Sequence, residues 1–242
     1  MPSVIKLSVN INKIALIRNS RGGNYPDLIK IARDCESFGA DGITIHPRPD
    51  ERHIRYSDIP SLKEIVTTEL NVEGNPSERF MSEVLKHKPH QCTLVPDSPS
   101  ALTSDRGWDT ISENAFLTDV VIALKDAGIR VSLFVDPSSK MVEGALKAGA
   151  DRVELYTGDY SSMYTKDREA AIRPHVEAAK TAFESGLGVN AGHDLNLDNL
   201  RYYAENIPHL LEVSIGHALV IDALYYGLGN VIPMYKHLLR PS

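Results

Sequence analysis

The chain has 242 residues, of which 42% are hydrophobic and 24% charged, and its formal net charge is −6. These values are typical of a globular protein, and the length suits a single domain over residues 1–242. The mild acidity argues against a nucleic-acid or anionic-membrane partner, because both bind a broad basic face.

The cysteines and the N-terminal segment predict a cytoplasmic protein. Cys35 and Cys92 stand far apart, without the spacing of a zinc site or the signs of an oxidising compartment. The opening residues MPSVIKLSVN lack the charged start, the long apolar stretch and the cleavage site of a signal peptide. No segment reaches the ~18 uninterrupted apolar residues that a membrane span needs.

One pattern recurs along the chain: a helix that ends in a small residue and glycine, followed by a short apolar strand. It occurs in SFGADGITIH, DAGIRVSLFVD, KAGADRVELYTG and ESGLGVNAGH. The glycines fit helix C-termini, where a left-handed conformation costs glycine little. The segments VIKLSVN, LNVEG, HQCTLVP and LLEVSIGH supply four more strands, so that eight strands alternate with about eight helices.

This alternation predicts an α/β fold with a parallel sheet. Eight units of this length favour a closed (β/α)8 TIM barrel over a doubly wound open sheet, although repeat counting alone does not exclude the latter. In such a barrel the carboxyl ends of the strands share one mouth, where the chemistry takes place. The strand-end residues expected there are Asn10, His46, Glu73, Asp136, Glu154, Tyr156, Asn190, His193, Gly216 and His217.

The segment IHPRPDERHIRY, residues 45–56, leaves the second predicted strand and concentrates positive charge in an acidic chain. Arg48 offers a planar fork for phosphate and His53 a proton-dependent donor, so the pair fits an anion site. The alternative is a solvated loop in which Asp50 and Glu51 neutralise the arginines. The segment alone favours neither reading.

A second anion site is predicted where the last strand turns into a helix through Gly216 and His217. The glycine permits close backbone approach, and the free N–H groups of a helix N-terminus attract anions. Phosphate commonly binds near strands seven and eight of this fold. The same two residues also fit an ordinary tight turn.

Three further strand-end groups can be read as catalytic or as structural. Glu73 fits a general base, because partial burial raises a carboxyl pKa, or a structural hydrogen-bond acceptor. Glu154 points into the barrel, where it must pair with a cation, as in a core salt bridge, or stay protonated. His193 follows a small-residue turn that lets its ring reach a substrate, or it caps a helix. No metal-ligand spacing or GxGxxG or P-loop fingerprint accompanies these residues.

Six segments in order resemble the pyridoxine 5'-phosphate synthase family, and together they cover nearly the whole chain. They are VNINKIALIRNSRGGNYPD, GADGITIHPRPDERHI, ELNVEG, VELYTG, VNAGHDL and SIGHAL. The resemblance implies a (β/α)8 barrel with additional short helices, assembled as a homo-octamer. It implies condensation of 1-deoxy-D-xylulose 5-phosphate with 3-amino-2-oxopropyl phosphate to give pyridoxine 5'-phosphate, inorganic phosphate and water, with no metal or organic cofactor.

The resemblance also assigns roles by position. It implies that His46 and Glu73 are general bases, that His193 is the general acid and that Glu154 stabilises the transition state. The implied contacts to the deoxyxylulose phosphate are Arg48, His53 and Thr103. The implied contacts to the aminoketone phosphate are Asn10, Arg21, Gly216 and His217. Thr103 lies in PDSPSALTSDRGW, which resembles a family loop that closes over the site.

Three residues depart from the family pattern. Many members have Asp and His where this chain has Asn12 and Lys13, and glycine where it has Asp194. Asn12 can still bind a sugar hydroxyl and Lys13 can face a phosphate, so both stay substrate-binding candidates. At Asp194 a backbone N–H can still meet a phosphate, although an anionic side chain beside it is unfavourable.

Two other functions remain open at the sequence level. The departures at Asn12, Lys13 and Asp194 allow a barrel that binds phosphosugars or pyridoxine phosphate without catalysis or with altered specificity. The fold also suits a different phosphosugar isomerase or aldolase, although the motif order does not support that class, and fold alone does not fix function.

Overall fold

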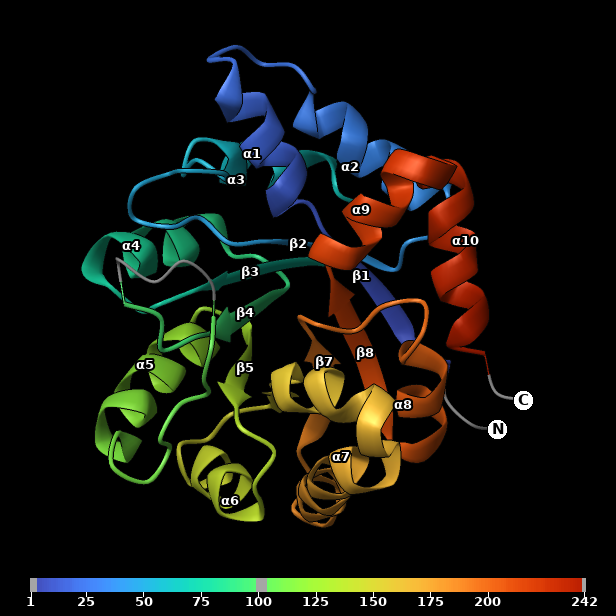
Figure 1. The fold of residues 1–242 in the computed structure, drawn as a ribbon. Coiled ribbons are helices and arrows are strands. Elements are labelled where there is room, and N and C mark those ends of the chain that lie inside the picture. The colour runs from blue at the N-terminus through green and yellow to red at the C-terminus, as the bar shows by residue number, and fades with distance from the viewer. Residues whose placement is uncertain (1–3, 99–103, 241–242) are drawn as a thin grey trace.

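Eight short segments form the parallel strands of a closed barrel in the computed structural model, which describes residues 4–98 and 104–240 (Figure 1). Each strand pairs with the next one in the chain, and the last pairs with the first. The strands are β1 (Lys6–Asn10), β2 (Gly42–Ile45), β3 (Leu70–Gly74), β4 (Gln91–Leu94), β5 (Arg130–Val135), β6 (Arg152–Leu155), β7 (Gly188–Gly192) and β8 (Leu210–Ile215). The closed topology confirms the predicted barrel and excludes the doubly wound open sheet.

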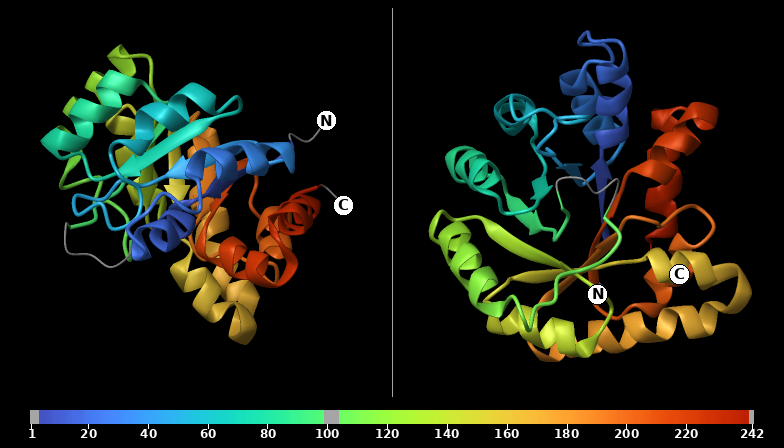
Figure 2. Two further views of the ribbon diagram at one scale, coloured as in Figure 1. Left: turned by 90° about the horizontal axis from the view of Figure 1, so that it is seen from above. Right: turned by 60° about the vertical axis from the view of Figure 1, so that its left-hand side comes forward.

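Helices follow every strand and cover the outside of the barrel (Figure 2). Two helices instead of one follow β1 and β8, which confirms the expected additional short helices. The helices are α1 (Asn12–Ser20), α2 (Leu28–Ser37), α3 (Asp58–Ile65), α4 (Glu78–His87), α5 (Asn114–Asp126), α6 (Ser139–Lys147), α7 (Gly158–Glu184), α8 (Leu200–Asn206), α9 (His217–Tyr226) and α10 (Leu228–Leu238). Within the described ranges, none of them has both the length and the apolar character needed to cross a membrane.

The predicted glycine pattern corresponds to real helix ends. The four glycines lie one residue beyond the C-caps of α2, α5, α6 and α7, with φ between 77° and 104°. A side chain at this φ is strained, so the glycines allow each helix to stop and the chain to enter the next strand. They are Gly39, Gly128, Gly149 and Gly186.

The strands alternate between an apolar outer face and a polar inner face. On β6, for example, Val153 and Leu155 are fully buried under the helices, whereas Glu154 lines a cavity at the centre of the barrel mouth. The inner face is polar because the barrel must hold charged groups at its centre.

Candidate active site

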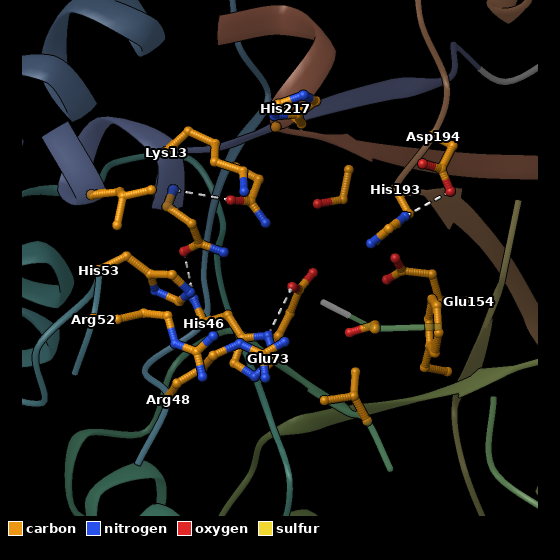
Figure 3. A pocket seen from close by; sticks show the side chains of 18 residues that line it. Lys13, His46, Arg48, Arg52, His53, Glu73, Glu154, His193, Asp194 and His217 are labelled. Atoms are coloured by element: carbon orange, nitrogen blue, oxygen red, sulfur yellow. Dashed lines mark hydrogen bonds and ion pairs between the residues drawn. The ribbon is translucent and has the colours of Figure 1, made fainter. Parts of the chain in front are cut away.

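A cavity of about 510 Å³ lies at the carboxyl ends of the strands, as predicted (Figure 3). Residues from all eight strands or the loops that follow them line it, so segments far apart in the chain meet there. The lining residues are Asn10, Asn12, Lys13, Leu16, His46, Arg48, Arg52, His53, Glu73, Val95, Ser104, Phe134, Glu154, His193, Asp194, Ser214, Gly216 and His217.

Most of the predicted site residues therefore share one cavity, and among the described ones Arg21 does not. Arg21 is the exposed C-cap residue of α1 and is not among the lining residues. Thr103 lies outside the described residues. The predicted substrate contacts of Arg21 and Thr103 remain predictions.

His46 and Glu73 form a close pair at the floor of the cavity. His46 Nδ1 lies 3.9 Å from Glu73 Oε2, and both side chains are largely buried. Burial raises the pKa of Glu73 to about 7, with the charge of Asp97 raising it further against the opposing effect of His193. Burial and the positive charge of Arg48 hold the pKa of His46 well below its usual range. At neutral pH His46 is consequently a neutral imidazole able to accept a proton.

Glu154 is a neutral carboxyl beside these two groups. Its side chain is 4% exposed, and burial together with Glu73 and Glu212 raises its pKa well above the ordinary value. The core salt bridge considered for Glu154 forms one layer deeper instead, where Arg152 Nη1 lies 3.4 Å from Glu212 Oε2. Of the two alternatives for Glu154, the protonated form is the one that its surroundings favour.

His193 differs from His46 in the direction of its pKa shift. Burial alone would lower the pKa of His193, but its hydrogen bond to Asp194 and the charge of that carboxylate raise it. The Nδ1 atom lies 2.7 Å from Asp194 Oδ2, and the ring of Tyr156 packs edge-on at a centroid distance of 5.7 Å. One cavity thus contains one histidine with a lowered pKa and one with a raised pKa.

The loop after β2 brings positive charge to one side of the cavity (Figure 3). Burial lowers the pKa of His53 to about 4, and Arg48, Arg52 and Lys13 lower it further by repulsion. These four side chains converge on one region of the cavity, which favours an anion there.

The solvated-loop alternative for this segment is wrong for the two residues that matter most. Arg48 is 4% exposed and His53 8%, so both are buried. Asp50 does pair with an arginine, at 2.8 Å from Arg52. Glu51 pairs with Arg79 of α4 at 2.6 Å.

The C-terminal end of α1 holds the loop after β2 by hydrogen bonds from outside the cavity. The side-chain amide of Asn19 donates to three successive carbonyl groups of the loop, those of residues 51, 52 and 53. The buried guanidinium of Arg18 donates to the carbonyl of His53 and to both carboxylate oxygens of Asp58. The positions of Arg52 and His53 therefore depend on two residues that are not part of the cavity wall.

Asn12 has a structural contact as well as a place in the cavity wall. Its Oδ1 accepts the backbone N–H of His46 at 2.9 Å, and its own N–H donates to Asn10 Oδ1 at 3.0 Å. Lys13 lies next to it and faces the cavity from the first turn of α1. The asparagine that departs from the family pattern thus helps to hold the strand end that carries His46.

Gly216 is the N-cap of α9 and lies against Asn10. A Cβ atom at this position would lie 3.0 Å from the Cβ of Asn10, so the close approach suits glycine. The first turn of α9 begins at the exposed His217 and opens on the cavity. The free N–H groups of this first turn fit an anion site of the kind that helix N-termini provide.

Sequence reasoning missed three polar residues of this region. Arg52 lines the cavity beside His53, and its place in the basic segment was a usable signal. Asp97 accepts hydrogen bonds from Arg48 Nη2 and Ser104 Oγ, both at 2.7 Å. No local pattern in the loop after β4 marks Asp97, because its partner Arg48 is distant in sequence.

Three expected strand-end residues do not line the cavity. Asp136 accepts the backbone N–H of Gly107 at 2.9 Å and so holds the loop after β4. Asn190 accepts from Arg152 at 3.1 Å, deeper in the barrel. The ring of Tyr156 packs edge-on against the ring of His193. Among the described residues, no group of three or more His, Cys, Asp or Glu side chains could hold a metal ion.

Comparisons with known proteins agree with these features. Residues 7–241 match the family model described as "Pyridoxal phosphate biosynthesis protein PdxJ". A pyridoxine 5'-phosphate synthase of Cytophaga hutchinsonii is 63% identical over 235 residues, covering 97% of this chain and 99% of the relative. One from Bacteroides fragilis is 61% identical over 235 residues with the same coverage.

A solved structure supports the fold alone. The 3-keto-L-gulonate-6-phosphate decarboxylase from Vibrio cholerae superimposes with a TM-score of 0.66, covering 99% of this chain and 100% of the other. Its sequence identity to this chain is 8%, so the likeness concerns the barrel and not its chemistry.

Proposed function

Because the chain belongs to the PdxJ family of pyridoxal phosphate biosynthesis proteins, its activity is that of a pyridoxine 5'-phosphate synthase in vitamin B6 biosynthesis, and we propose how the cavity performs it. The substrates that we propose are 1-deoxy-D-xylulose 5-phosphate and 3-amino-2-oxopropyl phosphate. Both bind in the one cavity and condense to pyridoxine 5'-phosphate, inorganic phosphate and water, without a metal or organic cofactor.

The observation that carries this proposal is the division of protonation states in the cavity. The pKa of His46 is lowered and that of Glu73 is about 7, so both suit proton removal, whereas the raised pKa of His193 suits proton donation. Imine formation and ring closure are dehydrations that need a base and an acid in turn. Groups with separated pKa values in one cavity can supply both at the same pH.

Glu154 has a different proposed role, because its carboxyl is neutral. A protonated carboxyl donates a hydrogen bond, and a donor fixed in a buried site stabilises negative charge that develops on a substrate oxygen. The buried position of Glu154 between Glu73 and Glu212 supports this role.

The two phosphate groups have separate proposed positions. Arg48, Arg52 and His53 suit the deoxyxylulose phosphate, with Lys13 beside them and Asn12 close to a sugar hydroxyl. The N-terminus of α9 suits the aminoketone phosphate. Holding both substrates in one cavity makes their condensation effectively intramolecular, which lowers the entropic part of the barrier. Thr103 and Arg21 stay expected contacts, whereas the backbone N–H of Asp194 donates to Thr157 Oγ1 at 3.2 Å and is not directed to a phosphate.

Phosphate release tests this function directly. The purified chain is incubated with both substrates and with each one omitted, while inorganic phosphate and pyridine absorbance are measured. We expect both signals only when both substrates are present. Tight binding of pyridoxine 5'-phosphate without any phosphate release would instead favour a barrel that binds without catalysis.

We propose further that the chain assembles as a homo-octamer in the cytoplasm. Large apolar side chains on α1 and α9 are exposed, among them Leu224 at 70% and Tyr225 at 82%, and such surfaces are typical of subunit contacts. The two cysteines, both buried and free, fit a reducing compartment. Light scattering coupled to gel filtration measures the subunit number, and a monomer at micromolar concentration would contradict the assembly.

A further inference from the structure

The side chains of His193 and Asp194 face each other although they are neighbours in the chain. Nδ1 of the imidazole lies 2.7 Å from Oδ2 of the carboxylate, and both residues line the cavity (Figure 3). The opposite edge of the ring points toward the centre of the cavity in the same view. The carboxylate therefore lies behind the histidine, on the side away from the proposed substrates.

The backbone explains how two adjacent residues make this contact. His193 has φ of +55°, in the left-handed region that a histidine seldom adopts. Its N–H donates to the carbonyl of Ser214 on β8 at 3.2 Å. The tight turn that results sets the two side chains on the same side of the chain.

Neighbouring elements hold Asp194 in place through its backbone. Its N–H donates to Thr157 Oγ1 at 3.2 Å, and its carbonyl accepts from Asn199 Nδ2 at 3.3 Å. Thr157 is fully buried and also donates to the carbonyl of Gly192. The N–H that the sequence analysis offered to a phosphate is thus directed to a threonine, and the side chain has a partner of its own.

From this geometry we propose that Asp194 is a positioning residue, whose carboxylate fixes the imidazole of His193 and keeps a proton on it for donation to the substrate. The inference rests on the proposed function, in which His193 is the general acid. A carboxylate at Nδ1 sets the ring orientation and stabilises the imidazolium, and the opposite nitrogen then presents its proton to the cavity.

Other groups around His193 raise or lower its pKa. Burial opposes its charge, while Glu73 on β3 and Asp97 after β4 favour it from across the cavity. His46 faces it from β2, and Tyr156 from β6 packs against the ring. Asp194 makes a direct hydrogen bond to the ring, so removing its charge has a large expected effect.

Two substitutions separate charge from orientation. Asp194→Asn keeps a hydrogen-bond acceptor for Nδ1–H but removes the charge, whereas Asp194→Ala removes both. Asp198→Asn is the matched control, because Asp198 is an exposed aspartate of the same loop and is not among the cavity residues. The histidine ring signals of each protein, assigned with His193→Gln, are titrated by ¹H–¹⁵N NMR, and kcat is measured from pH 6 to 9.

We expect the pKa of His193 to fall in Asp194→Asn and to stay unchanged in Asp198→Asn. A general acid loses activity as pH rises through its pKa, so the alkaline limb of the kcat profile moves to lower pH. At pH 8.5 kcat falls by at least ~5-fold, and at pH 6.5 by less than ~2-fold. Asp194→Ala loses kcat at both pH values, because the ring is no longer oriented.

An unchanged His193 pKa and an unchanged alkaline limb in Asp194→Asn would overturn the proposal, as would equal shifts in the Asp198→Asn control. If Asp194→Asn lowers the melting temperature but leaves the alkaline limb of the kcat profile in place, Asp194 has only a structural role. That result would also overturn the proposal. The NMR titration does not depend on turnover. A parent protein that shows no phosphate release would therefore refute the proposed function, while the coupling between the two side chains would still be measured.

Discussion

Glu73 shows how the interior of a barrel changes the chemistry of one side chain. An exposed glutamate is ionised throughout the neutral range and is a weak base, whereas burial raises the pKa of Glu73 to about 7. The nearby Nδ1 of His46, 3.9 Å away, is held neutral by the same burial and by Arg48. Both groups are thus adjusted to the pH at which the proposed proton transfers take place.

Substituting Glu73 by glutamine should reduce activity and increase the free energy of unfolding at alkaline pH. Turnover falls by at least ~100-fold, the scale of a lost general base. Because burial raises the pKa of Glu73 above its unfolded value, the protonated form favours folding below about pH 4.5, and this contribution is lost as pH rises to about 7. Glu73→Gln is therefore more stable than the parent by about 1–2 kcal/mol at pH 8, and nearly equal to it at pH 4.5.

Urea unfolding of both proteins at the two pH values measures this difference. Equal unfolding free energies at pH 8 would show that burial does not raise the pKa of Glu73. Full activity of the glutamine variant would separately contradict its role as a base.

His193→Ala should also lower turnover by at least ~100-fold with the fold intact. The residue is at the surface of the cavity, so circular dichroism and the melting temperature should change little compared with the loss of kcat. Phosphate release under saturating concentrations of both substrates measures the effect. Near-normal rates in both His193→Ala and Glu73→Gln would show that the proposed roles are wrong, even if the activity is right.

At the scale of elements, the loop after β2 is held by contacts from several sides. Asn19 and Arg18 fix its backbone, and Asp97 from the loop after β4 holds the guanidinium of Arg48 at 2.7 Å. The same carboxylate accepts from Ser104, which is the first described residue after the gap at 99–103. Asp97 thereby links the two loops that follow β2 and β4.

Asp97→Asn should weaken substrate binding more than chemistry. An amide cannot accept both hydrogen bonds with the strength of a carboxylate, so Arg48 is less well fixed for the proposed phosphate contact. We expect KM for 1-deoxy-D-xylulose 5-phosphate to rise about 10-fold while kcat changes less than 3-fold. Asp105→Asn, at an exposed aspartate of the same loop, is the control. A loss confined to kcat would argue against this positioning.

Element positions could be predicted from the sequence where local physics determines them. The segment LNVEG forms β3 over the predicted residues. The glycines mark helix ends because the chain adopts a positive φ there, which glycine tolerates best. Contacts such as Asp97 with Arg48 join residues 49 positions apart, and no local pattern encodes them.

At the scale of the whole molecule, the two ends of the barrel interior carry different sets of charged groups. The carboxyl ends of the strands carry the cavity. The amino ends carry an ion-pair network in which Arg130 bonds Glu69 at 3.0 Å and Arg152 lies 3.4 Å from Glu212. Glu69 also pairs with Lys6 at 3.2 Å. The sequence indicated the catalytic end because its residues follow the strands, whereas charges at strand starts carry no comparable signal.

Breaking this network should destabilise the fold. Arg152→Met leaves the buried carboxyl of Glu212 without its cation, which costs roughly 3 kcal/mol at neutral pH. The loss is smaller at pH 5.5, because burial already raises the pKa of Glu212 and the unpaired group can take up a proton. Thermal melting at the two pH values measures the difference.

The double variant Arg152→Met/Glu212→Gln is the matched control. It removes both charges, so it should regain most of the stability lost in the single variant. Equal melting temperatures for the single and double variants would show that the ion pair does not carry the effect.

The ion-pair network at the amino ends of the strands bears on the design of a more thermostable variant of this enzyme. Its members lie near the start of their strands, and Arg152 is two residues before Glu154 of the cavity wall. Redesigning the lower layer for heat tolerance, by exchanging charges for packed hydrocarbon, also alters the acid–base groups above it, because Glu212 raises the pKa of both Glu73 and Glu154. Durability and turnover therefore have to be selected together.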